Sequence, residues 1–242
     1  MKIFGKTHIG LVREINEDNL FLSRESIGKL PNLFIIADGM GGHKAGEVAS
    51  LLAVESFVKF CKGASSELSI EEIFIKATQF ANNVIYDQSI HTVDMSGMGT
   101  TLVACTLSED VLYVCNVGDS RLYVLENDLK QISIDHSFVE ELVRAGEITR
   151  EESYHHPAKN KITRALGVGS DIVVDIFKLK FKDLGKILLC SDGLTNMLTD
   201  YQMSKILRTN EPISLQGETL LNEALSQGGH DNITIILLEQ TN

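Results

Sequence analysis

The chain has 242 residues, and its hydrophobic content of 43% is enough for a sizeable core in one large domain or two small ones. A formal net charge of −11 argues against a general nucleic-acid binder, because such a protein needs a basic surface. No secretory signal is visible, and no apolar stretch approaches the roughly 20 residues of a membrane helix. The four cysteines form no C-x-x-C pair and lie in apolar segments, which is typical of buried thiols in a reducing cytosol.

The first half of the chain contains short apolar runs, typical of strands, and longer segments with a 3.6-residue apolar period, typical of helices. The first two runs, 3–12 and 19–24, are expected to form a hairpin-like pair around a polar segment. A glycine-rich turn at 39–42 should open the first helix. The elements predicted after the opening pair are a strand at 32–37, helices at 44–61 and 70–89, and strands at 99–107, 111–117 and 121–125.

The stretch 136–170 is polar, rich in charge and histidine, and carries two short helical patterns, so we expect a surface flap there. The elements predicted beyond it are strands at 171–180 and 186–190, helices at 200–208 and 212–227, and a closing strand at 232–239. No linker-like tract or charge block divides the chain, which favours a single domain over 1–242. Strands and helices follow each other in groups, which favours an α+β fold with a sandwich of antiparallel sheets flanked by helices.

Four aspartates lie where apolar runs begin or end. Asp38, Asp119 and Asp192 each follow such a run, and Asp231 precedes one. Because strand ends meet at the rim of a rigid sheet, carboxylates from distant parts of the chain can converge there. Gathered carboxylates repel one another and raise each other's pKa unless a cation compensates. The set therefore predicts a site for a hard divalent cation, Mg2+ or Mn2+, bound through oxygen.

Other catalytic signatures fit the sequence less well. Gly41 to Gly46 has the glycine spacing of a P-loop, but Glu47 and Val48 stand where lysine and serine or threonine are required. No G-x-S-x-G nucleophile motif occurs. The segment Cys115 to Arg121 has the C-x5-R spacing of cysteine-dependent phosphatases, but a strand follows it and an aspartate inside it would repel thiolate and phosphate. A cysteine-dependent phosphatase stays as a minor alternative.

Six short polar motifs follow one another along the chain. They are Arg13-Glu14-Ile15-Asn16-Glu17-Asp18, Asp38-Gly39-Met40-Gly41-Gly42-His43, Gly99-Thr100-Thr101, Gly118-Asp119-Ser120-Arg121, Ser191-Asp192-Gly193 and Gly229-His230-Asp231-Asn232. Their order resembles the metal-dependent serine/threonine protein phosphatases of type 2C (the PPM family) in their compact bacterial form. The resemblance covers essentially the whole chain, and it implies a four-layer α-β-β-α sandwich with helix pairs on both sides and a small flap.

The resemblance implies a catalytic centre with two Mn2+ or Mg2+ ions. Asp38 would bridge the ions, the backbone carbonyl of Gly39 would bind one, and Asp192 and Asp231 would bind the other. Asp119 would help Asp192 to hold a third, weaker ion. A hydroxide that bridges the two ions would attack phosphorus in line, so that no covalent phosphoenzyme is needed.

The resemblance also assigns residues around the ions. Arg13 would hold the phosphate by a charge-assisted, bidentate contact. Glu17 and Asp18 would orient bound water from outside the ligand shell. Apart from the resemblance, Asn232 is expected to be structural and to order the loop that carries Asp231.

Protonation of the leaving alkoxide is not assigned by the motifs. Some family members carry a histidine, proposed as the general acid, where this chain has Met40. The proton donor therefore stays open between bound water and His43, which follows the glycine-rich turn.

The predicted activity is hydrolysis of phosphoserine and phosphothreonine on proteins by a cytoplasmic monomer, without a nucleic-acid or membrane partner. A bacterial enzyme of this family would oppose a serine/threonine kinase, a partner that the family implies and these residues do not. The rival class is a non-catalytic relative that keeps the fold and binds a partner. The retained aspartates and Arg13 argue against it, because such a protein usually loses a ligand.

Overall fold

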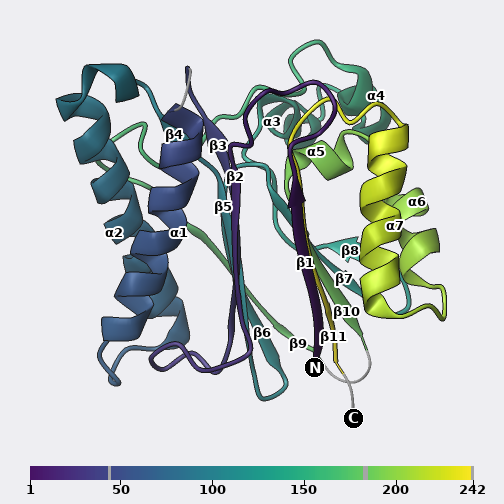
Figure 1. Cartoon of the computed structure of the whole chain (residues 1–242), viewed down its shortest axis with the longest axis horizontal. Coiled ribbons are helices and arrows are strands. Elements are labelled where there is room, and N and C mark those ends of the chain that lie inside the picture. Colours follow the sequence, from purple (N-terminus) through teal and green to yellow (C-terminus); the bar gives the residue numbers. More distant parts are fainter. Residues whose placement is uncertain (43–44, 182–184, 241–242) are drawn as a thin grey trace.

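The computed structural model describes residues 1–42, 45–181 and 185–240 (Figure 1). The strands are β1 (Lys2–His8), β2 (Asp18–Ser23), β3 (Leu33–Met40), β4 (Gly99–Thr100), β5 (Leu102–Ser108), β6 (Val111–Val117), β7 (Arg121–Leu125), β8 (Leu129–Gln131), β9 (Asp175–Lys180), β10 (Lys186–Cys190) and β11 (Ile233–Glu239). The helices are α1 (Ala45–Gly63), α2 (Ile70–His91), the 3-10 turn η1 (Val93–Met95), α3 (Phe138–Ala145), α4 (Arg150–His155), α5 (Asp192–Thr195), α6 (Asp200–Leu207) and α7 (Ile213–Ser226). Within the described ranges, no helix is long and apolar enough to cross a membrane.

The strands form two antiparallel sheets. The first sheet has the order β1-β11-β10-β7-β8, and the second has the order β2-β3-β5-β6-β9 with the short β4 paired to β3. The sheets lie face to face, with α1 and α2 outside the second sheet and α6 and α7 outside the first (Figure 1). The predicted four-layer sandwich is confirmed.

Alternating side chains along each strand divide the core into three apolar layers. On β3, Leu33, Ile35 and Ala37 pack toward α1 and α2. Phe34 and Ile36 point the other way, into the layer between the two sheets. A third layer lies between the first sheet and α5, α6 and α7. Because both faces of each sheet are covered, the central strands read as continuous apolar runs in the sequence.

The predicted opening hairpin is wrong. β1 pairs with β11 from the other end of the chain, whereas β2 pairs with β3, so the first two strands belong to different sheets. The two strands still pack closely, since a Cβ at Gly5 would lie 2.3 Å from Cδ2 of Leu22. The loop 9–17 is long enough to cross from one sheet to the other. The apolar pattern of a strand does not reveal which other strand it pairs with.

Three short elements were not predicted, namely β8, η1 and α5. They span three, three and four residues, too few for an apolar period to show. Of the three, α5 matters most to function, because it begins at Asp192.

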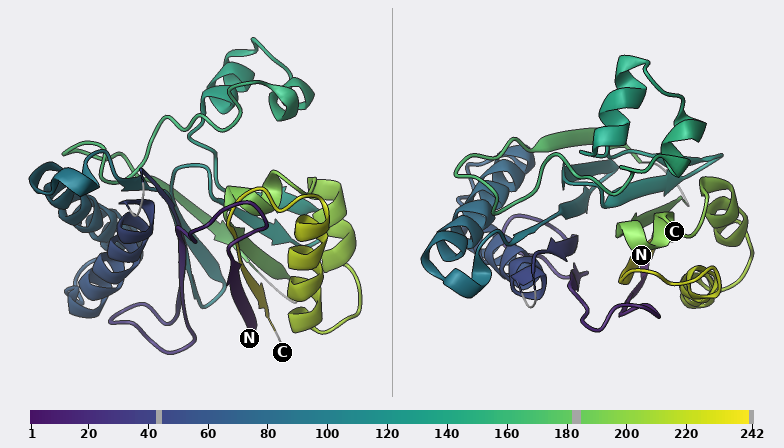
Figure 2. Two further views of the ribbon diagram at one scale, coloured as in Figure 1. Left: turned by 45° about the horizontal axis from the view of Figure 1, so that its top comes forward. Right: turned by 90° about the horizontal axis from the view of Figure 1, so that it is seen from above.

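The two short helices expected in the flap are α3 and α4, and they stand away from the sheets (Figure 2), whereas Leu166, near the end of the range 136–170, is buried in the core and pairs with Thr100. The helix α3 begins at Ser137, whose side chain caps it, and ends at Gly146 in the left-handed conformation (φ 74°). A capping box begins α4. The start of the flap is fixed to the sandwich, because the backbone N–H of His136 donates to the Gly118 carbonyl at 2.9 Å.

A close contact between α7 and β1 gives a test of the packing. A Cβ at Gly217 would lie 2.2 Å from Cδ1 of Phe4. Helix propensity alone would favour alanine in α7 by about 1 kcal/mol. Overpacking of this kind costs about 1–3 kcal/mol. We therefore expect Gly217→Ala to lower the free energy of unfolding by up to about 2 kcal/mol, measured by urea denaturation.

The matched control is Gly63→Ala at the end of α1, where nothing lies within 4 Å of the added Cβ. This variant should be neutral or slightly stabilising. A Gly217→Ala protein that is more stable than the wild type would contradict the close contact with Phe4.

Candidate active site

The aspartates predicted to bind metal lie at one end of the sandwich, on segments from both sheets. Asp38 lies near the end of β3 in the second sheet. In the first sheet, Asp192 opens α5 directly after β10, and Asp231 comes shortly before β11. Asp119 lies in the turn between β6 and β7. The ladders that join β7, β10 and β11 place these last three segments next to one another.

The aspartates are close enough to repel one another. Burial raises the pKa of Asp38 well above its ordinary value, and the charges of the neighbouring aspartates raise it further. Burial and the charge of Asp231 raise the pKa of Asp192 to about 6. Burial and the charge of Asp192 likewise raise the pKa of Asp119 well above its ordinary value. The positive charge of Arg121 lowers the pKa of Asp119 and Asp192 but does not offset burial and the neighbouring aspartates.

Asp18 connects the two sheets beneath the site. It lies on β2, directly opposite Asp38 in the ladder, and its side chain is buried. Its Oδ2 accepts hydrogen bonds from Ser191 Oγ at 2.7 Å and Thr234 Oγ1 at 2.6 Å, both from the first sheet's side. Its Oδ1 is buried without a hydrogen-bond partner among the described residues, and burial raises the pKa of Asp18 to about 7. A buried carboxylate oxygen left unpaired in this way is suited to receive water or a cation.

The backbone around Asp38 is fixed by the segment that follows β4. The Thr101 N–H donates to the Asp38 carbonyl at 2.9 Å, and the Asp38 N–H donates to Thr101 Oγ1 at 3.0 Å. Thr100 Oγ1 also donates to the Asp38 carbonyl, at 2.9 Å. The next residue, Gly39, packs so tightly on α1 that a Cβ would lie 2.0 Å from the Gly46 carbonyl oxygen. A side chain at position 39 would therefore push α1 away from the site.

Arg13 reaches the site from the loop between β1 and β2. Its Nη2 donates to Asp231 Oδ2 at 2.8 Å, and its Nη1 lies 3.9 Å from Glu17 Oε2. Although burial lowers it, the pKa of Arg13 is raised overall by Asp231 and Glu17. About half of its side chain stays exposed, at 47%. The guanidinium thus stands at the open edge of the carboxylate group.

Asn232 holds both ends of the loop that carries Arg13. Its Nδ2 donates to the Ile9 carbonyl at 2.8 Å and to the Ile15 carbonyl at 3.0 Å. Its Oδ1 accepts from the Glu17 N–H at 2.8 Å. One side chain therefore sets the path of the whole loop relative to the start of β11.

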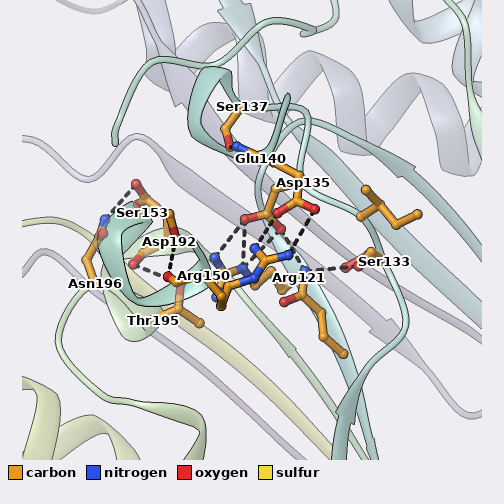
Figure 3. A network of polar contacts seen from close by, with 12 residues as sticks. Arg121, Ser133, Asp135, Ser137, Glu140, Arg150, Ser153, Asp192, Thr195 and Asn196 are labelled. Carbon is orange, nitrogen blue, oxygen red and sulfur yellow. Dashed lines mark hydrogen bonds and ion pairs between the residues drawn. The ribbon is translucent and has the colours of Figure 1, made fainter. Parts of the chain in front are cut away.

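A polar pocket of about 300 Å3 opens between the flap and α5, and both Asp119 and Asp192 line it. Asn196, one helical turn beyond Asp192, donates from Nδ2 to Asp192 Oδ2 at 2.9 Å (Figure 3). The pocket is thus continuous with the aspartate group, and Asn196 holds one of its carboxylates in place.

Two ion pairs line the same pocket (Figure 3). Arg121 binds Asp135 at the start of the flap, with Nε to Oδ1 at 3.0 Å and Nη2 to Oδ2 at 2.7 Å. Arg150 on α4 pairs with Glu140 on α3, which joins the two flap helices. These contacts order the flap and the turn that carries Asp119, because Arg121 directly follows that turn.

Cys115 lies away from the aspartates. Its side chain is fully buried in the apolar layer between α1, α2 and the second sheet, and burial raises the pKa of its thiol. Arg121, at the other end of the C-x5-R spacing, is bound to Asp135. A cysteine nucleophile needs an accessible thiolate, so the geometry argues against a cysteine-dependent phosphatase.

The carboxylates do not all point to one spot in this structure. Among the described residues, no group of three or more His, Cys, Asp or Glu side chains is arranged to hold a metal ion. Asp231 is turned toward Arg13, and His43 lies outside the described residues. The ligand chemistry nevertheless fits a hard cation, because the site offers carboxylate oxygens, raised pKa values and an unpaired buried oxygen on Asp18.

Three polar residues next to the site were missed from the sequence. Asn196 follows Asp192 at helical i,i+4 spacing, a signal that an expected helix would have revealed. Ser191 lies inside a recognised motif but was given no role. Thr234 is a hydroxyl inside the apolar run 233–238, and a polar residue in such a run indicates a buried hydrogen bond.

Comparison with known proteins shows which family the chain resembles in sequence and fold. The family model described as Protein phosphatase 2C matches residues 4–227. The serine/threonine phosphatase stp of Listeria innocua is 42% identical over 241 residues, which cover 97% of this chain and 94% of the relative. The crystal structure of the serine/threonine phosphatase Stp1 from Staphylococcus aureus has a TM-score of 0.92 at 33% identity, covering 100% of this chain and 95% of that one.

A further solved structure contains metal. The catalytic domain of the serine/threonine protein phosphatase PstP, in complex with two manganese ions, has a TM-score of 0.85 at 32% identity. The alignment covers 98% of this chain and 96% of that domain. The family match over most of the chain and the similarity of the whole fold lead to one assignment. This chain belongs to the protein phosphatase 2C family of serine/threonine phosphatases.

Proposed function

We propose that this chain hydrolyses phosphoserine and phosphothreonine on proteins with the help of Mn2+ or Mg2+. The observation that carries the proposal is the group of aspartates whose burial and mutual repulsion raise their pKa values. The manganese-bound PstP domain supports Mn2+ as the ion. Asp38, the Gly39 carbonyl, Asp192 and Asp231 are the proposed ligands of two ions, and Asp119 would join Asp192 in holding a third.

The chain's own residues would position the reactants. Bound divalent ions would lower the pKa of water and offset the charge of the phosphate. Arg13 is exposed enough to turn from Asp231 to the phosphate, where its guanidinium can donate two hydrogen bonds. Asn196 would keep Asp192 in one orientation, and Asp18 would accept a hydrogen bond from ordered water through its unpaired oxygen. Such water-positioning residues outside the ligand shell affect metal affinity and rate.

The leaving alkoxide needs a proton, and Met40 cannot provide one because its thioether carries no ionisable hydrogen. The proposed donors are bound water and His43. The variant His43→Gln would distinguish the two donors. The pH profile of kcat should change in this variant only if His43 is the proton donor.

The cellular setting is proposed from the family. A serine/threonine kinase would supply the phosphorylated proteins, and the enzyme would act in the cytoplasm as a monomer with one phosphatase domain over 1–242. The non-catalytic, partner-binding alternative predicts tight Mn2+ binding without turnover, so it is tested by the same experiment as the activity.

Loss of one proposed ligand should abolish turnover. We expect phosphate release from a phosphothreonine peptide in Mn2+, its loss in EDTA, and a decrease in kcat of more than about 100-fold in Asp192→Asn. The matched control is Asp171→Asn, which removes an exposed aspartate and should keep full activity. Release that persists in EDTA would contradict the metal mechanism, and Mn2+ binding without release from any phosphopeptide would favour the partner-binding alternative.

The raised pKa values also predict how the metal-free protein responds to pH. Asp18 and Asp192 have folded-state pKa values of about 7 and about 6, whereas unfolded aspartates titrate near 4. Between these values the folded state binds more protons, so the free energy of unfolding falls as pH rises. In EDTA, the melting temperature should therefore be about 3–6 °C higher near pH 5.5 than near pH 7.5.

Two controls test whether the aspartates cause this pH dependence of the melting temperature. Burial lowers the pKa of His136, so this residue acts with the opposite sign, and the wild type must be compared with a variant. In EDTA, Asp192→Asn should show a smaller dependence on pH than the wild type. Added Mn2+ should also reduce the dependence, because bound ions replace protons. An unchanged pH slope in Asp192→Asn would contradict the assignment.

The loop contacts of Asn232 predict a defect in phosphate binding. Asn232→Ala removes three hydrogen bonds that fix the loop carrying Arg13, so we expect KM for a phosphopeptide to rise about 10-fold, with a smaller decrease in kcat. Arg13→Ala should show the same pattern. If Asn232 acts through Arg13, the double variant should be little worse than Arg13→Ala alone. Additive effects in the double variant would show that Asn232 acts by another route.

A further inference from the structure

An open groove lies beside the proposed metal centre, at the C-terminal end of α2. We call it the apolar groove after its aliphatic residues Ile90, Val93 and Val168; it has a volume of about 490 Å3, and Ser89, Thr92 and Ser96 also line it. Its aliphatic side chains are exposed, at 58% for Ile90, 90% for Val93 and 63% for Val168. Single exposed aliphatic residues are normal on a protein surface, but several around one groove indicate a binding surface. Among the residues that the structure describes, no charged side chain lines this groove.

One wall of the apolar groove is held in a fixed position by a buried amide. Asn82 on α2 accepts from the Gly167 N–H through Oδ1 at 2.9 Å and donates to the Gly169 carbonyl through Nδ2 at 2.9 Å. The backbone there has no room for a side chain, since a Cβ at Gly167 would lie 2.3 Å from Cγ2 of Ile85. The groove is therefore formed before any ligand arrives, which lowers the entropy lost on binding.

The same wall is joined through Thr100 of β4 to the strand that carries Asp38. Leu166 and Thr100 exchange two backbone hydrogen bonds of 2.9 and 3.1 Å, and Thr100 Oγ1 donates to the Asp38 carbonyl. A Cβ at Gly99 would lie 2.7 Å from Met40 Cε and 3.2 Å from Val168 Cγ2. The side chains of Met40, beside Gly39, and of Val168, at the rim of the groove, therefore both lie close to Gly99.

We infer that the apolar groove binds an aliphatic side chain of the phosphoprotein substrate, close in sequence to the phosphorylated residue. This inference rests on the metal centre proposed above, because that centre fixes where the phosphate lies. An extended chain advances about 3.3 Å per residue, so one flanking position of the substrate would bring its side chain to the groove. Val93 and Val168 would be specificity-determining residues, and Asn82 would act only by positioning Val168.

The test uses phosphothreonine peptides of serine and glycine in which a single leucine is moved through the flanking positions. Hydrolysis is measured in Mn2+ beside that of p-nitrophenyl phosphate, which carries no flanking residues. The wild type should prefer leucine over serine at one position by about fivefold to tenfold in kcat/KM. The double variant Val93→Ser/Val168→Ser should lose this preference and hydrolyse p-nitrophenyl phosphate at the wild-type rate.

The matched control is Leu215→Ser on α7, which removes an exposed leucine (48%) from the far side of the sandwich and should keep the preference. A flat leucine profile in a wild type that hydrolyses p-nitrophenyl phosphate would overturn the groove assignment and leave the proposed function intact. A dimer that the double variant converts to monomer, with leucine preference unchanged, would identify the groove as a contact between copies and also overturn it. Hydrolysis of neither substrate would overturn the proposed function, and the groove assignment with it.

Discussion

The buried carboxylate of Asp18 is the constraint on which the site depends. The apolar layer between the two sheets holds them together, but such contacts are not directional and leave the sheets free to slide. Asp18 on β2 adds directional contacts between the sheets. It accepts two short hydrogen bonds, from Ser191 and Thr234, which belong to the side of the first sheet. These residues adjoin Asp192 and Asp231 in the chain, so the carboxylates of the first sheet are set at a fixed distance from Asp38.

Without bound ions, the group of buried aspartates lowers the stability of the folded protein. Burial together with repulsion raises the pKa of Asp38, Asp119 and Asp192, so each of them disfavours the folded state when it is ionised. The rest of the fold has to compensate, and the three apolar layers do so. Strand β3 is an example. Its side chains alternate between two apolar layers, and Asp38 lies near its end. Stability lost at a functional site and recovered in the core is a common compromise in enzymes.

The sequence predicts the apolar strands and long helices well, because their periods follow directly from burial. The sequence also indicates which aspartates are candidates for the site, because a charged residue at the end of a buried apolar run stands out from its neighbours. The sequence does not predict features that depend on which other segment of the chain an element contacts. β1 and β2 look like a hairpin, yet they join different sheets through β11 and β3. The role of Thr234 depends on that pairing and on Asp18, and the apolar groove depends on residues 70 or more positions apart along the chain.

Thr100 shows why the centre and the groove would act together. Its hydroxyl is bound to the Asp38 carbonyl, and its backbone is paired with Leu166, two residues before Val168. A shift of the groove wall would therefore move the strand that carries Asp38, unless the hydrogen bonds of Thr100 broke. Because Asn82 and the close contact at Gly167 resist such a shift, the groove is a rigid extension of the site. A side chain seated there would fix the position of the neighbouring phosphate, and positional restraint of this kind is a large part of catalysis.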